Sequence, residues 1–137
     1  MALVLDTGPI YSSLDRSDPD HEAVRELLRS TPRPHVVVEP VLVEVDYWAR
    51  KLLDVSAFEA LLSDVAAGRY ELVCLDADDL LRAVEVEARY ADAGLGFVDA
   101  AIVAVCERLE IGTVATFDHR HFGMIRTKRR RSLELLP

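Results

Sequence analysis

The most restrictive feature of this sequence is a set of short apolar runs in which hydrophobic and polar residues do not alternate. An unbroken run of this kind is typical of a strand that is buried on both faces, as in the middle of a parallel sheet. Three such runs predict strands at Leu3–Leu5, Val36–Val38 and Leu72–Leu75. A fourth strand is predicted at Gly112–Phe117, and Ser132–Leu136 is a candidate fifth.

Stretches with apolar residues at helical spacing lie between these runs. We expect helices after Pro9, from Asp20 to Thr31, from Pro40 to Leu52, around Phe58–Val65, from Asp76 or Asp78 to about Gly94, and over Phe97–Leu109. Strands that alternate with helices predict a three-layer α/β/α domain with a mostly parallel central sheet of four to five strands. Since no linker or repeat interrupts the 137 residues, we expect a single domain over residues 1–137.

The same spacing assigns particular side chains to the core or to the surface. The expected inward-facing residues include Trp48 and Leu52 in one helix, and Leu80, Leu81, Val84 and Ala88 in another. Cys74 and Cys106 lie far apart in apolar segments, so we interpret both as buried thiols rather than as a disulfide or a zinc site. We interpret the acids Asp76, Asp78 and Asp79 as helix caps and solvated surface.

Half of the residues are hydrophobic, which is typical of a folded globular chain. Met1 leads directly into the first apolar run, without the basic segment and cleavage site of a signal peptide. No apolar stretch is long enough to cross a bilayer. We therefore expect a cytoplasmic protein without membrane contact.

The formal net charge of −8 argues against a polyanionic partner, but the charge is unevenly distributed. Residues 119–131 hold six basic residues and no acidic one: Arg120, Arg126, Lys128, Arg129, Arg130 and Arg131. Removing these six leaves 10 basic residues against 24 acidic ones. The basic segment is either a solvated surface or an edge that contacts phosphates beside an acidic pocket.

Four acidic residues occupy special positions in the predicted arrangement of strands and helices. Asp6 ends the first apolar run and Asp118 follows Gly112–Phe117, while Glu44 and Asp99 lie near the starts of their helices on apolar faces. Strand carboxyl ends and the starts of the following helices share one edge of an α/β sheet, so we expect the four acids to converge there. Each acid alone could instead be a helix cap or a turn residue.

An inward carboxylate is costly unless it is paired or coordinates a metal. Ligands that offer only oxygen favour Mg²⁺ or Mn²⁺ over zinc. Mg²⁺ is often held by carboxylates together with substrate phosphates, which indicates attack of an activated water on phosphorus. Thr116 lies two residues before Asp118, faces the same side of its strand, and is a candidate for orienting water or phosphate.

Four motifs around these acids resemble those of PIN-domain nucleases, and more closely those of VapC-type toxins from VapBC toxin–antitoxin modules. They are Leu5-Asp6-Thr7, Pro40-Val41-Leu42-Val43-Glu44-Val45, Phe97-Val98-Asp99-Ala100-Ala101-Ile102-Val103-Ala104 and Thr116-Phe117-Asp118. The segment from Phe117 to Phe122 is also similar to this group. The resemblance covers essentially the whole chain.

The resemblance implies a metal-dependent endoribonuclease that cuts structured RNA, such as tRNA, rRNA or mRNA, and that a cognate antitoxin inhibits. By resemblance, Asp6, Asp99 and Asp118 are metal ligands and catalytic residues, and Glu44 completes the site directly or through water. The resemblance also implies a homodimer. Candidate substrate-positioning residues are Thr7, Thr116, Arg120 and the run Lys128–Arg131. Thr7-Gly8-Pro9 departs from the Ser-Ala that is frequent in the family, which leaves substrate positioning open.

Several other functions remain to be weighed. A phosphoacceptor receiver domain needs a paired acid after Asp6 and a late Lys, and a haloacid-dehalogenase-like phosphatase needs an acid where Gly8 stands. Two alternatives stay open: a catalytically silent protein-binding module of the same fold, and a structure-specific DNA nuclease.

Overall fold

A computed structural model describes residues 2–129 and 131–137 of the chain. Its sheet has five strands in the order β3-β2-β1-β4-β5, and every neighbouring pair is parallel. The strands are β1 (Leu3–Leu5), β2 (His35–Val38), β3 (Glu71–Val73), β4 (Thr113–Ala115) and β5 (Glu134–Leu136). The five predicted strands are confirmed, with shifts of a few residues at their ends.

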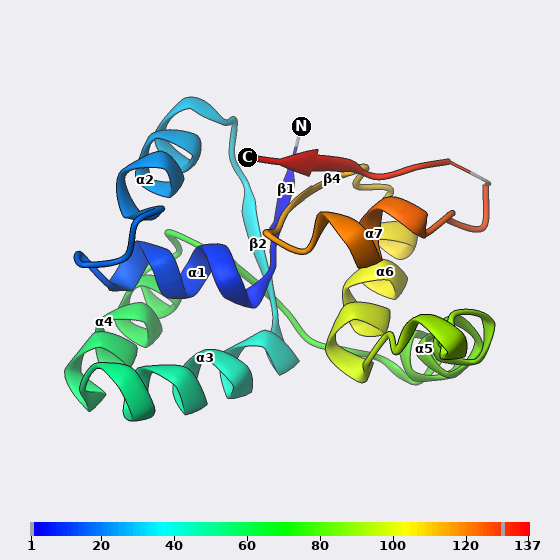
Figure 1. The fold of residues 1–137 in the computed structure, drawn as a ribbon, viewed down its shortest axis with the longest axis horizontal. Helices are drawn as coiled ribbons and strands as arrows, with labels where there is room; N and C mark the ends of the chain where they lie inside the picture. Colours follow the sequence, from blue (N-terminus) through cyan, green and yellow to red (C-terminus); the bar gives the residue numbers. More distant parts are fainter. Residues whose placement is uncertain (1, 130) are drawn as a thin grey trace.

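Helices cover both faces of this sheet (Figure 1). They are α1 (Thr7–Leu14), α2 (His21–Ser30), α3 (Glu39–Leu52), α4 (Val55–Ala66), α5 (Ala77–Arg89), the 3-10 turn η1 (Ala91–Ala93), α6 (Phe97–Leu109) and α7 (His119–Met124). Helices α1–α4 lie on one side of the strands and α5–α7 on the other, as right-handed crossovers require when the strand order reverses. The predicted three-layer α/β architecture is confirmed.

The strand order reverses at β1. From β1 the sheet grows through β2 to β3 in one direction, and from β4 to β5 in the other. In open α/β sheets, ligands bind in the crevice at such a switch point, outside the carboxyl ends of the strands. The segments that follow β1 and β4 are therefore the expected position of a site.

Burial follows the apolar runs at the centre of the sheet. All residues of β1 and β2 are buried, and α6 buries the continuous segment from Ala100 to Cys106. By contrast, the edge strand β3 buries only Val73. Cys74 follows this edge strand and is exposed, so the prediction that both thiols are buried is wrong for Cys74 and right for Cys106.

The predicted inner face of α5 is wrong. Leu81 and Val84 are each 65% exposed, and Leu80 and Ala88 are exposed as well. The helix packs against α6 through Ala83, Val86 and a buried acid, Asp79. Two apolar stripes run along α5, and spacing alone does not tell which one faces the core.

Asp79 is therefore not part of the solvated surface, as the sequence suggested. Its carboxylate is buried and accepts hydrogen bonds from the Arg108 guanidinium of α6, with Oδ2 and Nη2 2.8 Å apart. Asp76 does cap α5, as predicted, and exchanges side-chain and backbone hydrogen bonds with Asp79. The Arg108 partner makes the buried carboxylate tolerable.

Trp48 and Leu52 also face outward, contrary to the prediction. Helix α3 buries Val41, Val45 and Ala49 instead, and leaves Trp48 40% exposed.

Within residues 2–129 and 131–137, none of the helices combines the length and the apolar composition that a membrane span requires.

Candidate active site

Asp6 lies where β1 ends and α1 begins, at the switch point of the sheet. It is the N-cap of α1, and its Oδ1 accepts a hydrogen bond from the Thr7 backbone N–H at 2.8 Å. Its Oδ2 accepts from the Thr116 hydroxyl at 2.7 Å, across the switch point. Both Asp6 and Thr116 are buried, so neighbouring strand ends hold this carboxylate in one orientation.

Glu44 reaches the same place from α3, the helix that follows β2. The Thr7 hydroxyl donates to Glu44 Oε1 at 2.8 Å, and this bond joins the starts of α1 and α3. Thr7 and Thr116 thus each orient one carboxylate through a side-chain hydrogen bond.

Asp118 is the N-cap of α7, directly beyond β4. Its backbone N–H donates to Thr116 Oγ1 at 3.0 Å, so Thr116 contacts both Asp6 and Asp118. Asp99 projects from the first turn of α6. One oxygen each of Asp99 and Asp118 and a ring nitrogen of His121 lie within 4.8 Å of one another.

The four acids (Asp6, Glu44, Asp99 and Asp118), hereafter the acidic cluster, perturb one another electrostatically. Burial, and then the charges of Asp6, Asp118 and Glu44, raise the pKa of Asp99 to about 7. The pKa of Asp6 is also raised, mainly by burial. Burial raises the pKa of Asp118 too, but hydrogen bonds from the backbone and ring of His121 outweigh it and leave that pKa lowered.

In the part of the chain that the structure describes, no lysine or arginine side chain pairs with the acidic cluster. Among the described residues, the ion pairs formed by Lys and Arg side chains all involve other acids, and only the His121 ring approaches Asp118. Arg120 lies on α7 with its side chain exposed, and its positive charge lowers the pKa of Asp118 without an ion pair. Four partly or fully buried carboxylates without a lysine or arginine partner in this part of the structure suit a divalent cation.

The acids line one side of a cavity of about 530 Å³. Its other side is largely apolar and aromatic, and consists of Gly8, Tyr11, Trp48, Leu52 and Phe117. A Cβ atom on Gly8 would lie 2.8 Å from the Phe117 ring, so glycine at this position lets the ring lie against α1. The outward orientation of Trp48 and Leu52 therefore adds an apolar wall to the site.

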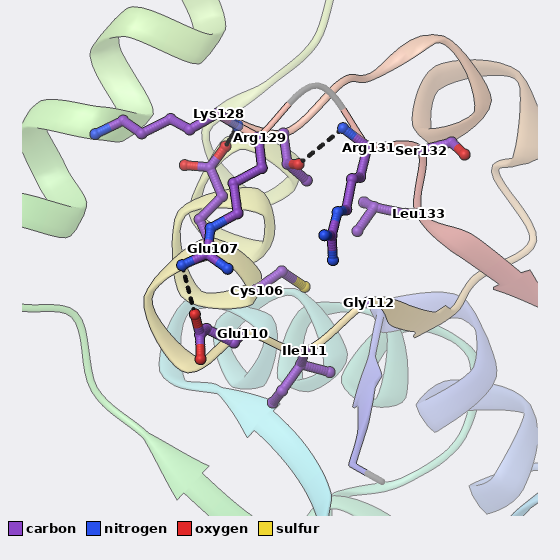
Figure 2. A pocket seen from close by; sticks show the side chains of 11 residues that line it. Cys106, Glu107, Glu110, Ile111, Gly112, Lys128, Arg129, Arg131, Ser132 and Leu133 are labelled. Atoms are coloured by element: carbon purple, nitrogen blue, oxygen red, sulfur yellow. Dashed lines mark hydrogen bonds and ion pairs between the residues drawn. The ribbon is translucent and has the colours of Figure 1, made fainter.

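The basic run lies elsewhere. Lys128, Arg129 and Arg131 surround the C-terminal end of α6, where Arg129 pairs with Glu110 and the Lys128 backbone N–H donates to Glu107 (Figure 2). Arg130 lies outside the described residues. This end of α6 precedes β4, whereas the acidic cluster follows it, so Lys128, Arg129 and Arg131 do not form a basic edge beside the acidic pocket.

Sequence reasoning missed His121 and the aromatic wall. His121 lies three residues after Asp118, at a helical spacing that becomes meaningful only if α7 is recognised as a helix. Trp48 follows Glu44 by four residues, and this spacing shows that the two share a helix face. The sequence thus puts Trp48 beside Glu44, but it predicts a buried Trp48 rather than one that lines an open cavity.

The comparisons with known proteins agree with this geometry. A family model described as PIN domain matches residues 3–128. Ribonuclease VapC26 of Mycobacterium tuberculosis is 33% identical over 124 residues, which are 90% of this chain and 92% of that protein.

Solved structures show the same fold. VapC20 of M. tuberculosis, described as a Sarcin-Ricin loop cleaving toxin, matches with a TM-score of 0.80 at 21% identity and covers 86% of this chain and 91% of its own. VapBC2 of Rickettsia felis, bound to a promoter DNA fragment, matches with a TM-score of 0.67 at 20% identity over 98% and 97% of the two chains. The chain therefore belongs to the PIN-domain family, in the group that contains the VapC ribonucleases.

Proposed function

We propose that this protein is a metal-dependent endoribonuclease and the toxin of a toxin–antitoxin pair. The observation that carries the proposal is the acidic cluster, in which four carboxylates from four different segments meet at the switch point without a Lys or Arg partner among the described residues. The relative at 33% identity is a ribonuclease by name, which supports RNA as the substrate.

In this proposal Asp6, Asp99 and Asp118 hold Mg²⁺ or Mn²⁺, and Glu44 completes the ligand set directly or through water. The bound cation would supply Lewis-acid activation of water and offset the charge that develops on the phosphodiester. Thr7 and Thr116 fix the orientations of Glu44 and Asp6. Arg120 is proposed as a phosphate contact, because its exposed cationic side chain follows Asp118 by two residues and its charge lowers the pKa of that carboxyl.

Purified protein incubated with total cellular RNA tests this function. We expect a few discrete fragments with Mg²⁺ or Mn²⁺ and none with EDTA. Equal cleavage with EDTA would contradict metal dependence, and no cleavage with metal would favour the silent binding module. Single-stranded and branched DNA serve as parallel substrates, and cleavage of these in preference to RNA would favour the DNA nuclease.

Thr116→Val is expected to slow RNA cleavage by about 10- to 100-fold, the usual effect of removing a group that orients a metal ligand. The valine keeps the shape of the buried side chain but removes the hydroxyl that joins Asp6 to the Asp118 backbone. Thr113→Val is the control, because the Thr113 hydroxyl lies at the other end of the same strand and donates to Glu134. Equal cleavage rates for the two variants would show that Thr116 has no role in the active site.

The antitoxin is proposed to cover the apolar wall of the cavity. Several solved relatives are toxin–antitoxin complexes, including one from Klebsiella pneumoniae. Trp48 and Leu52 are exposed next to Glu44, so a partner seated on them would also block access to the acids.

Since the proposed substrate is cellular RNA, we further propose that the protein acts in the cytoplasm. We also propose that residues 1–137 act as one domain.

A homodimer through the outer face of α5 is also proposed, because Leu80, Leu81 and Val84 form an exposed apolar stripe on one helix. Leu81→Glu is expected to convert a dimer to a monomer in light scattering, since the charge would be buried at the interface. Leu62→Glu, at an exposed leucine of α4, is the control and should leave the mass unchanged. A monomeric wild-type protein, or a dimeric Leu81→Glu variant, would contradict this interface.

A further inference from the structure

His121 spans two segments of the chain that carry acids of the cluster. Its Nδ1 lies 2.6 Å from Asp118 Oδ2, and its Nε2 lies 2.8 Å from the Ala93 carbonyl oxygen in η1. The Ala93 carbonyl and an ionised Asp118 can only accept hydrogen bonds, so the ring donates to both when each of its nitrogens carries a hydrogen. The imidazole thereby joins the start of α7 to the turn that leads into α6.

Asp118 is held by this residue at both carboxylate oxygens. Oδ1 accepts from the His121 backbone N–H at 3.0 Å, and Oδ2 accepts from the ring. Asp99 has no comparable support, because its carboxylate accepts no hydrogen bond from residues 2–129 and 131–137. The placement of Asp118 relative to Asp99 therefore depends on how α7 is fixed to the segment before α6.

A second hydrogen bond joins the same two segments. The backbone N–H of Arg126, after α7, donates to the Tyr90 hydroxyl, before η1, at 2.9 Å. This bond contacts none of the four acids, whereas the His121 bridge ends on one of them. The bond from Arg126 to Tyr90 therefore only attaches the two segments to each other, whereas the His121 ring also orients the Asp118 carboxylate.

We propose that His121 is a positioning residue, which orients Asp118 toward Asp99 so that the two carboxylates bind one divalent cation. This inference rests on the proposed metal site. Both ring nitrogens already have partners, so His121 acts through Asp118 rather than as a ligand. Groups that orient metal ligands typically contribute 10- to 100-fold to metal affinity.

Calorimetric titration of Mn²⁺ into the full-length protein tests the proposal. His121→Phe keeps a ring of similar size but removes both donors, and we expect its Kd for Mn²⁺ to rise about 10- to 100-fold. His121→Asn keeps a donor near the position of Nδ1, so it should recover part of the affinity. Tyr90→Phe removes only the second bond and should bind Mn²⁺ within about twofold of wild type.

The outcomes are separable. Wild-type protein that fails to bind Mn²⁺ would overturn the metal site itself. If wild type binds but His121→Phe binds equally well or more tightly, the positioning role of His121 is wrong. Equal losses in His121→Phe and Tyr90→Phe would show that attachment of the segments matters rather than orientation of Asp118. Thermal unfolding of each variant in EDTA reports folding, and His121→Asn keeps the test valid if His121→Phe does not fold.

Discussion

Asp99→Asn is expected to lower the rate of RNA cleavage by about 10²- to 10⁴-fold and, in the absence of metal, to stabilise the fold. The loss of activity follows because the carboxylate is a proposed ligand of a cation whose charge stabilisation amounts to several kcal/mol. The gain in stability follows because Asp99 sits among three other acids, whose charges help to raise its pKa to about 7. A variant that loses activity while gaining stability is typical of a functional site.

The stability effect has a defined pH dependence. The pKa of Asp99 is raised in the folded state from its ordinary value of 3.8 to about 7, so the folded protein holds this proton more tightly than the unfolded chain. Its favourable contribution is complete below about pH 4 and is lost as the pH rises toward 7. Asparagine does not ionise, so the variant should exceed wild type by about 1–2 kcal/mol at pH 8, a value reduced for partial solvent screening.

Urea unfolding in EDTA at pH 4 and pH 8 measures this difference. We expect Asp99→Asn and wild type to unfold at similar urea concentrations at pH 4, and the variant to be more resistant at pH 8. Adding Mn²⁺ at pH 8 should stabilise wild type more than the variant, because only wild type keeps the complete ligand set. A variant that is less stable than wild type at pH 8 in EDTA would show that the acidic cluster carries no electrostatic strain.

Arg82→Met is expected to destabilise the protein by about 2–4 kcal/mol, because it leaves a buried carboxylate without its main partner. The Arg82 guanidinium of α5 binds Glu107 of α6 through Nε and Nη2, at 2.7 and 2.9 Å. The side chains are only 15% and 9% exposed. Glu107 also accepts from the Lys128 backbone N–H, so the pair fixes the C-terminal segment to the α5–α6 layer.

Arg50→Met is the matched control. Arg50 pairs with Asp46 at 2.8 Å, but the side chains of that pair are 61% and 32% exposed. Its loss should change the free energy of unfolding by less than about 0.5 kcal/mol. Adding Glu107→Gln to Arg82→Met should recover part of the loss by removing the buried charge. Equal losses of unfolding free energy in Arg82→Met and Arg50→Met would contradict the burial of the Arg82–Glu107 pair.

The strands and the convergence of the four acids were predictable because the signals are local. An apolar run without alternation identifies a central strand, and an acid directly after such a run has to lie at its carboxyl end. For Asp6 and Asp118 this reasoning needs no knowledge of packing. Glu44 and Asp99 needed only one further step, from the helical spacing of their neighbours.

The remaining features depend on packing partners that the sequence does not reveal. Helix α5 has two apolar stripes, and the buried face contains Asp79, whose carboxylate is paired with the Arg108 side chain of α6. Trp48 lies on a face of α3 that helical spacing treats as apolar, yet the cavity beside Glu44 leaves it half open to solvent. Neither outcome follows from periodicity within one helix.

The position of the basic run follows from the order and direction of the last two strands. Because β5 is parallel to β4, the chain must return from the carboxyl edge to the amino edge of the sheet before β5 begins. Lys128, Arg129 and Arg131 lie shortly before β5 and therefore toward the amino edge of the sheet, opposite the carboxyl edge that holds Asp118. Their proximity to Asp118 in sequence is therefore misleading.

Binding of Mn²⁺ tests the acidic cluster most directly, because a cation is the feature on which cleavage, stability and the role of His121 all depend. Wild-type protein, Asp99→Asn and Asp6→Asn should be titrated with Mn²⁺ by calorimetry at pH 8, alongside Asp46→Asn, whose carboxylate pairs with Arg50 outside the cluster. We predict binding by wild type and Asp46→Asn, and binding that is at least tenfold weaker in the two cluster variants. Binding that is unaffected by Asp6→Asn and Asp99→Asn, or no binding by wild type, would contradict a metal centre built from these four acids.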